Sequence, residues 1–431
     1  IETTSLIADG PVFSLPAGAA KLAVGLERRE ESLDHSVPDP ADPLEDLVTG
    51  RYSRHVGSAF GELSLPLIGR ADRPNAAPRL DLSVAGRYED YSDFGHTANP
   101  QIRLRWIPID SVKLRGSWGR SFRAPKLDDL YDSAQNASYL VSLPDPRSPT
   151  GRSTVLGIQG DNPNLKQETA TTWTAGFDVV PAFDPGFKLS LTYYSIDYTG
   201  QIATPGAGNP FAILMQEAEW ASVITRNPTA AQIAAVCNRP DYVYSRTACL
   251  ASTPAAIVDF RLANLAQTRV NGLDLDVQQK LRTGAGVFDF GMTGSYVLHF
   301  DQAVTADSPA VDILNTMGNQ LRLRLRASAG WDQRPAAEAG LGASLAINFS
   351  NGYDNPGSAL LPRIDSLTTA DVQLRYRTGT AAGFLSGMEF ALNAVNVFNE
   401  SPPFVDNQFG YDVANYQSLG RVLSFSVRKR W

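Results

Sequence analysis

The sequence predicts an all-β chain folded as an antiparallel transmembrane β-barrel, and three observations support this prediction. Apolar and polar residues alternate with a period of two in one segment after another. The breaks between these segments are short and long in turn. No run approaches the roughly 20 consecutive apolar residues that a membrane-spanning helix needs.

The alternation is clearest at residues 321–331, LRLRLRASAGW, where leucines and arginines occupy opposite parities. On a helix, residues two apart point in nearly opposite directions, so neither set would form one face. On a strand the two sets separate, and an arginine on the lipid face costs about 2–4 kcal/mol near the bilayer midplane. We therefore expect the leucines and Trp331 to face lipid and the arginines to face a wet lumen. The residues concerned are Leu321, Leu323 and Leu325 on one parity, and Arg322, Arg324 and Arg326 on the other.

About fifteen segments of this kind follow one another, most near the roughly 9–11 residues that a tilted membrane-crossing strand needs. The expected strands are 1–8, 22–27, 52–68, 80–89, 102–106, 112–118, 172–179, 187–193, 273–278, 288–300, 321–331, 341–350, 372–377, 388–394 and 423–431. The short breaks are 9–18, 69–76, 107–110, 181–186, 282–286, 332–338 and 378–383. The long breaks are 31–51, 122–165, 200–262, 301–317, 351–363 and 398–414, and the break at 92–96 is modest. A soluble sandwich has no reason to keep this rhythm, so the pattern favours an outer-membrane barrel.

Composition excludes several other classes of protein. A net charge of -7 without a basic stripe gives no reason to expect nucleic acid as a partner. The four histidines are scattered without ligand spacing, so we predict no metal site and no cofactor. There is no G-x-S-x-G motif and no clear Ser/His/Asp set, so we expect the chain not to be an enzyme.

The two cysteines, Cys237 and Cys249, lie twelve residues apart in the longest break. In an oxidising compartment they could close a small disulfide loop, and the alternative is two unpaired thiols. A short helix is expected in the same break, near Thr229–Val236.

At residues 116–131, GSWGRSFRAPKLDDLY, the chain resembles the TonB-dependent receptors of Gram-negative outer membranes. Further pieces match that family in order: NPNLKQETATTWTAGFD (162–178), ANLAQTRVNGLDLDV (263–277), NAVNVFNESPPFV (393–405) and a last strand ending on an aromatic residue. The motif residues are Gly116, Arg120, Arg123, Ala124, Pro125, Tyr131, Asn162, Pro163, Leu165, Glu168, Asn396, Phe398 and Asn399, and the barrel-insertion signal comprises Phe425, Val427 and Trp431.

The resemblance implies a 22-stranded barrel with a plug domain in its lumen, inserted by the barrel-assembly machinery and powered through the TonB complex. With about fifteen strands, residues 1–431 are expected to be an N-terminally incomplete barrel domain. The plug, the first strands, the TonB-contacting segment and the signal peptide are expected to be missing. Outer-membrane lipid and the plug are then its structural partners.

The function that the resemblance implies is uptake of a scarce, bulky ligand: a siderophore-iron complex, a cobalamin-like cofactor or an oligosaccharide. A passive porin-like channel, and a non-transporting surface adhesin or assembly barrel, are the alternatives. Candidate ligand-binding residues in the outer loops and the lumen are Arg123, Tyr131, Tyr139, Trp220, Tyr242, Phe404, Tyr411, Arg322 and Arg324.

Each candidate also has a structural interpretation. The arginines are expected first to pair with the plug or with lumenal carboxylates, because confined charges are normally paired. The carboxylates expected as partners are Asp274, Asp276, Asp371 and Glu389. One element of the motif could contact ligand but is expected instead to shape the start of an outer loop; it comprises Arg120, Arg123, Asp128, Asp129 and Tyr131. The loop aromatics would equally pack the loops against each other. Four tryptophans are expected to lie at the membrane interfaces: Trp106, Trp118, Trp173 and Trp331.

Overall fold

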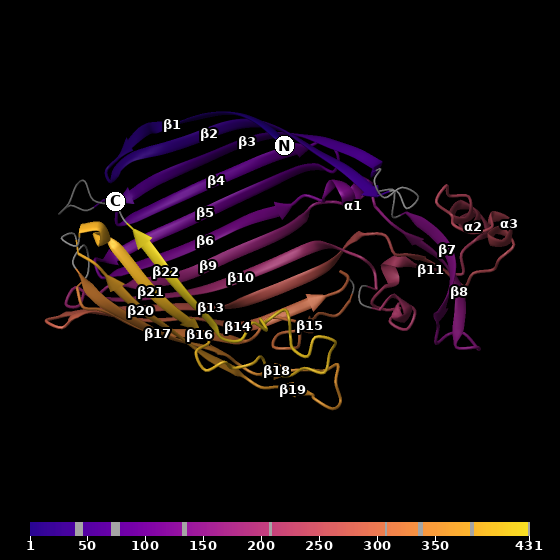
Figure 1. Cartoon of the computed structure of the whole chain (residues 1–431). Helices are drawn as coiled ribbons and strands as arrows, with labels where there is room; N and C mark the ends of the chain where they lie inside the picture. The colour runs from indigo at the N-terminus through magenta and orange to yellow at the C-terminus, as the bar shows by residue number, and fades with distance from the viewer. Residues whose placement is uncertain are drawn as a thin grey trace.

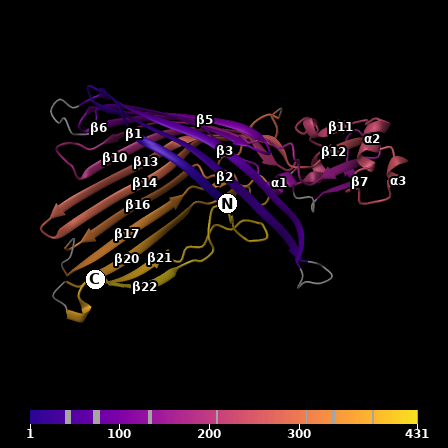
Figure 2. The ribbon, with the colours of Figure 1, turned by 90° about the horizontal axis from the view of Figure 1, so that it is seen from above.

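The computed structural model describes residues 1–38, 46–69, 78–131, 136–206, 209–306, 308–334, 339–379 and 383–429. Its main feature is one curved antiparallel sheet in which fifteen strands follow one another in chain order (Figure 1, Figure 2). The strands are β1 (Glu2–Leu15), β2 (Gly18–Pro38), β3 (Asp46–Ile68), β4 (Leu80–Tyr91), β5 (Gly95–Ile109), β6 (Val112–Arg123), β9 (Glu168–Val179), β10 (Phe187–Ala203), β13 (Ala263–Thr283), β14 (Gly286–Ala303), β16 (Leu323–Asp332), β17 (Gly340–Ser350), β20 (Leu367–Arg377), β21 (Met388–Val395) and β22 (Val422–Lys429).

The connections between these strands confirm the expected alternation of loop lengths. Short turns gather at the end of the sheet where the C-terminus lies, and the long loops gather at the opposite end (Figure 1). The edges of the sheet are β1 and β22, and no backbone pairing joins these two strands in the part of the chain that the structure describes. No plug domain lies among the described residues. The expectation that further strands precede Ile1 stays a prediction.

The two faces of the sheet differ in chemistry, as the alternation predicts. One face carries exposed apolar side chains, among them Leu374, Leu423 and Phe425 with 53%, 67% and 65% of their surface accessible. The opposite face carries ion pairs between neighbouring strands, such as Arg326–Asp371 at 3.0 Å. This is the arrangement of a barrel wall with lipid outside and water inside. Among the described residues, no helix is both long and apolar enough to cross a membrane.

Three details of the predicted strands are wrong. Residues 9–18 are not a turn, because β1 continues to Leu15, with Pro11 paired to Lys21 and a register shift between Pro11 and Phe13. The break at 31–51 is largely strand, because β2 and β3 stay paired as far as Pro38 and Asp46. Leu321 does not face lipid: it lies before β16, only 1% exposed, in an apolar cluster with Tyr353.

The loops at 124–167 and 204–262 combine into a folded unit, which we term the loop module (Figure 1). Its core is a four-stranded sheet in the order β11-β12-β8-β7, in which β12 and β8 run parallel. The elements are β7 (Ala137–Pro144), β8 (Arg152–Gln159), β11 (Ile224–Arg226), β12 (Ala256–Asp259), α2 (Ala230–Cys237) and α3 (Arg246–Leu250), with 3-10 turns η2 (Pro210–Ala212) and η3 (Ala221–Val223).

Both faces of this small sheet are covered, which explains its unbroken apolar runs. On β8, Val155 belongs to one apolar cluster and Leu156 to another, and Val258 and Ile257 on β12 divide in the same way. Helix α2 forms where a helix was expected, with Thr229 as its N-cap in a capping box.

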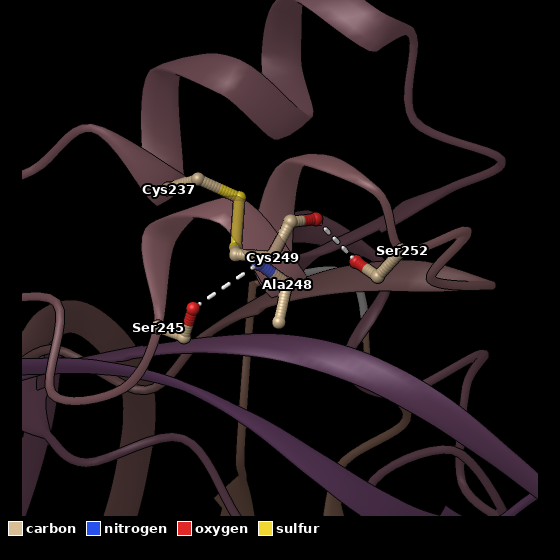
Figure 3. Close-up of a disulfide and its surroundings, with 5 residues drawn as sticks. All are labelled: Cys237, Ser245, Ala248, Cys249 and Ser252. Carbon is tan, nitrogen blue, oxygen red and sulfur yellow. Dashed lines mark hydrogen bonds between the residues drawn. A yellow bond between two sulfur atoms is a disulfide. The ribbon is translucent and has the colours of Figure 1, made fainter.

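A disulfide joins Cys237 at the end of α2 to Cys249 in α3, with the Cα atoms 5.7 Å apart (Figure 3). Both cysteines are fully buried in the second apolar cluster of the module. The Ser245 hydroxyl accepts a hydrogen bond from the backbone N–H of Ala248 and so caps α3. The sequence left this linkage open between a disulfide and two thiols, and the structure contains the disulfide.

The remaining loops at the same end form a smaller apolar cluster. It contains Leu321, Tyr353, Ile364, Val405 and Tyr416, which come from three different loops. The short elements of this region and of the opposite end are β15 (Val311–Asp312), β18 (Tyr353–Asp354), β19 (Arg363–Ile364) and η4 (Gly383–Leu385).

Candidate functional site

The motif at 116–131 is clamped to the barrel wall where β6 ends. The guanidinium of Arg54, on β3, is buried and donates a hydrogen bond to the carbonyl oxygen of Pro125 at 2.8 Å. The same guanidinium pairs with Glu31 at 2.6 Å and with Asp93 at 3.4 Å. The chain then forms the short helix α1 (Leu127–Tyr131), and the Tyr131 ring stacks on Tyr52 with 5.8 Å between ring centroids. The motif therefore sets the start of an outer loop.

A second junction is built on Glu168, the first residue of β9, which is 1% exposed. Its carboxylate accepts hydrogen bonds from the backbone N–H of Ile202 at 2.7 Å and from the Tyr198 hydroxyl. Arg123 completes the group with an ion pair at 3.1 Å. Side chains or backbone groups of three strands thus meet at one buried carboxylate. Arg123 is ion-paired with this carboxylate, although about half of the arginine side chain is exposed.

The other motif residues serve comparable junctions. The Asn162 side chain donates to the Leu262 carbonyl oxygen at 2.8 Å, and Leu165 is buried. Asn396 and Asn399 adopt the left-handed backbone conformation, with φ of 52° and 61°, that Asn tolerates better than most residues. The Asn396 side chain bonds both to the N–H and to the carbonyl oxygen of Glu400. The motif residues hold the ends of strands and loops in place.

The lumenal arginines proposed as ligand contacts have partners within the wall. Arg322 donates to the Leu298 carbonyl oxygen at 3.3 Å, and Arg324 donates to the side-chain oxygen of Asn415 in the last outer loop. The predicted pairing of an arginine with Asp371 is confirmed by Arg326. Arg375 and Arg377 share Asp332, a carboxylate that the sequence analysis did not single out.

The loop aromatics divide into buried and accessible residues. Trp220 and Tyr242 are only 7% and 8% exposed, because each packs in one of the two apolar clusters of the loop module. The prediction that they contact ligand is therefore wrong: they are core residues of the module. Tyr411 packs against the cluster around Tyr353. Phe404, in the last outer loop, is 68% exposed. Phe398, which belongs to the family motif, is 74% exposed.

The predicted membrane-facing residues of the last strand and the tryptophans lie on the apolar face. Phe425 and Val427 are 65% and 49% exposed on β22, and Trp431 lies outside the described residues. Trp118 and Trp173 are direct neighbours across β6 and β9, near the middle of both strands. Trp106 and Trp331 lie near the short-turn end of their strands. The placement of these tryptophans at the membrane interfaces stays a prediction.

One cavity of about 520 Å³ lies where α1 meets the loop module, and we term it the rim cavity. Asp128 and Asp129 of α1, Asp161 after β8 and Tyr139 of β7 contribute to its lining together with Phe260 and Leu262. Its volume lies in the range of about 300–1,000 Å³ that is usual for small-molecule sites. Burial and the neighbouring Asp128 carboxylate raise the pKa of Asp129.

Of the residues that the sequence singled out, Tyr139, Asp128 and Asp129 line the rim cavity. The cavity was missed because its lining comes from five segments between Asp128 and Leu262 that only the fold of the module brings together. The Asp-Asp pair after the Arg-Ala-Pro motif was the only signal in the sequence, and it had no visible partner.

The family model "TonB dependent receptor-like, beta-barrel" matches residues 8–399 of this chain. The chain therefore belongs to the TonB-dependent receptor β-barrel family. No curated protein matches the sequence.

Several solved structures share the fold. The ferric enterobactin receptor PfeA of Pseudomonas aeruginosa superposes with a TM-score of 0.62 at 18% identity, covering 99% of this chain and 53% of its own. The siderophore receptor PirA of Acinetobacter baumannii gives a TM-score of 0.60 at 16% identity, covering 99% and 54%. The outer membrane transporter YddB of Escherichia coli gives 0.61 at 13% identity, covering 99% and 53%. The chain spans about half the length of these proteins.

Proposed function

We propose that this chain forms the wall and the outer loops of an outer-membrane receptor that takes up a scarce, bulky ligand by TonB-dependent transport. The observation that carries the proposal is the division of the sheet into an apolar outer face and an ion-paired inner face, with structured loops confined to one end. A passive pore needs no folded, disulfide-linked loop module at its mouth. A receptor uses such a surface to capture its ligand.

The proposed partners follow from the two faces. Outer-membrane lipid covers the apolar face, and the barrel-assembly machinery inserts the sheet. A plug domain fits the charged inner face, where a hollow of about 600 Å³ is lined by Asp274, Asp276, Arg324 and Arg326 among others. The plug would carry the contact with the TonB complex. The chain itself is proposed to act in binding and transport, and not as an enzyme.

A siderophore-iron complex is the first ligand class to test, because PfeA and PirA are siderophore receptors. A cobalamin-like cofactor and an oligosaccharide are the other two classes. The experiment deletes the full-length gene from its host and measures growth with each ligand class as the sole source of iron, cobalamin or carbon. Uptake of the labelled ligand is then measured with and without a protonophore, because TonB draws on the energy of the inner membrane.

The proposal expects a growth defect on one ligand class, restored by the gene, and uptake that stops when the protonophore is added. Uptake that continues unchanged with the protonophore supports the passive channel. Normal growth and uptake on all three ligand classes, with lost surface attachment or lost assembly of other barrels, supports the non-transporting alternative.

A further inference from the structure

The rim cavity lies between α1 and the sheet of the loop module, and hydrogen bonds and packing hold its lining in place. The Arg54 and Glu168 junctions hold α1 and the start of β9, and the four-stranded sheet of the module holds Tyr139 and Phe260. The Tyr139 ring lies directly over Gly157 of the neighbouring strand, where an added Cβ atom would approach it to 3.0 Å. A side chain larger than glycine would therefore displace this ring.

The polar part of the cavity is acidic, and among the described residues no basic side chain lines it. Asp128, Asp129 and Asp161 are each partly buried, and among the described residues none of them forms an ion pair. The nearby guanidinium of Arg261 is occupied by Asp259 at 2.7 Å, and that of Arg123 by Glu168. Lys126 reaches Asp129 with its backbone N–H at 3.4 Å. Burial and the like charge of Asp128 disfavour the charged form of Asp129. The nearest basic groups, those of Arg261, Arg123 and Lys126, act on these carboxylates from outside the cavity lining. A cation that entered the cavity would stabilise the charged carboxylates further.

The apolar part of the cavity is independent of these carboxylates. The ring faces of Tyr139 and Phe260 line it, together with Leu262 and Pro205. The Tyr139 hydroxyl donates to the side-chain oxygen of Gln159 at 3.1 Å, which fixes the orientation of the ring. Aromatic faces attract cations as well as apolar groups, so both halves of the lining favour the same kind of ligand.

We propose that the rim cavity binds a ligand that carries a protonated amine or guanidinium on an apolar or aromatic body. The cation lies against Asp128, Asp129 and Asp161, and the body packs on Tyr139 and Phe260. The proposal rests on the proposed function in that it makes a cationic group part of the captured ligand. An anionic ligand is repelled from this cavity, because the three charged side chains that line it among the described residues are all acidic.

The test measures binding of two probes to the purified full-length receptor by saturation-transfer NMR. Tyramine has a phenol ring and a protonated amine, and N-acetyltyramine keeps the ring but carries no charge. The double variant Asp128→Asn and Asp161→Asn removes two charges without changing side-chain size. The matched control is Asp365→Asn, an exposed carboxylate that lines a different outer cavity of about 570 Å³.

Tyramine is expected to bind about tenfold more tightly than N-acetyltyramine, since one charge-assisted contact amounts to roughly this factor. The double variant is expected to lose this preference, and the control is expected to keep it. Equal binding of the two probes, no binding of tyramine at millimolar concentration, or an unchanged preference in the double variant would overturn the proposal. If the receptor transports its ligand but does not bind tyramine as expected, the ligand proposed for the rim cavity is refuted and the proposed function is not. If it binds tyramine as expected but transports no ligand, only the proposed function is refuted.

Discussion

The loop module depends on one buried ion pair, and its removal is a direct test of how the module is stabilised. Asp145, which follows β7, is 2% exposed. It accepts two hydrogen bonds from Arg226, at 2.6 and 3.1 Å, one from the Ser153 hydroxyl at 2.6 Å and one from the backbone N–H of Arg147 at 3.0 Å. The Asp145→Asn substitution removes the charge and leaves the guanidinium of Arg226 facing a neutral amide.

Breaking a buried pair by removing one partner costs about 3–5 kcal/mol. Arg226 keeps a second carboxylate, Glu217, at 2.9 Å, so we expect the lower end of that range, about 3 kcal/mol. The matched control is Arg147→Gln, because Arg147 pairs with the same Glu217 at 3.2 Å but is 68% exposed. That change should cost less than about 1 kcal/mol.

Native-state hydrogen exchange of the amides in β7, β8 and β12 measures this loss. A loss of about 3 kcal/mol makes opening of the module about 100-fold more frequent, and exchange accelerates in proportion. Equal exchange in the wild type and in Asp145→Asn, or the same acceleration in Arg147→Gln, would refute the reasoning.

The same pair predicts a dependence on pH. Hydrogen bonds from Arg226 lower the pKa of Asp145 well below its usual range. A carboxyl group whose pKa is lower in the folded state stabilises that state above its unfolded pKa of about 3.9, and the contribution fades as pH falls toward the folded pKa. Protection of the module should therefore decline below about pH 4 in the wild type, and Asp145→Asn should lack this part of the decline.

Three further predictions concern the disulfide, the faces of the sheet and the motif clamp. Replacing Cys237 and Cys249 by serine should destabilise α2 and α3 by about 2–4 kcal/mol. Intact mass measured with and without reductant shows whether the linkage is present. Free thiols in the folded wild-type protein would contradict it. Ala327→Arg places a charge on the lipid face and should lower the unfolding free energy in vesicles by about 2–4 kcal/mol. Its neighbour Ser328 faces the lumen, so Ser328→Arg should have little effect. Equal losses in the two variants would exclude the assigned faces. Arg54→Gln leaves Glu31 and Asp93 without their shared cation and should accelerate amide hydrogen exchange in α1. Arg51→Gln breaks only an exposed pair with Asp34 and should not accelerate this exchange. Similar exchange rates in both variants would show that Arg54 does not hold the motif in place.

The strands and the alternation of loop lengths could be predicted from the sequence because the period of two persists through each strand and lipid penalises any error of register. Leu321 shows where this reasoning fails. Its parity matches that of Leu323 and Leu325, but the strand begins only at Leu323, so the chain before it follows the packing of the loops.

The loop module could not be predicted in the same way. Its strands β8 and β12 are short apolar runs covered on both faces, so they show no alternation. Trp220 and Tyr242 looked like accessible loop aromatics because nothing local reveals that the module has two apolar clusters of its own. The rim cavity is lined by residues as far apart in the chain as Asp128 and Phe260, and so it required the structure.

The barrel wall is defined by which side chains of β16 face lipid and which face the lumen. A cysteine scan of residues 323–329 tests this assignment most directly. The two native cysteines are joined in a disulfide, so each introduced thiol is the only reactive one among the described residues. In vesicles, a fluorophore at Leu323, Leu325 or Ala327 should be quenched by brominated lipid. A thiol at Arg324, Arg326 or Ser328 should instead react with a membrane-impermeant reagent. Quenching and reactivity that fail to alternate from one residue to the next, or that alternate with the opposite parity, would contradict a barrel wall with its leucines in lipid and its arginines in the lumen.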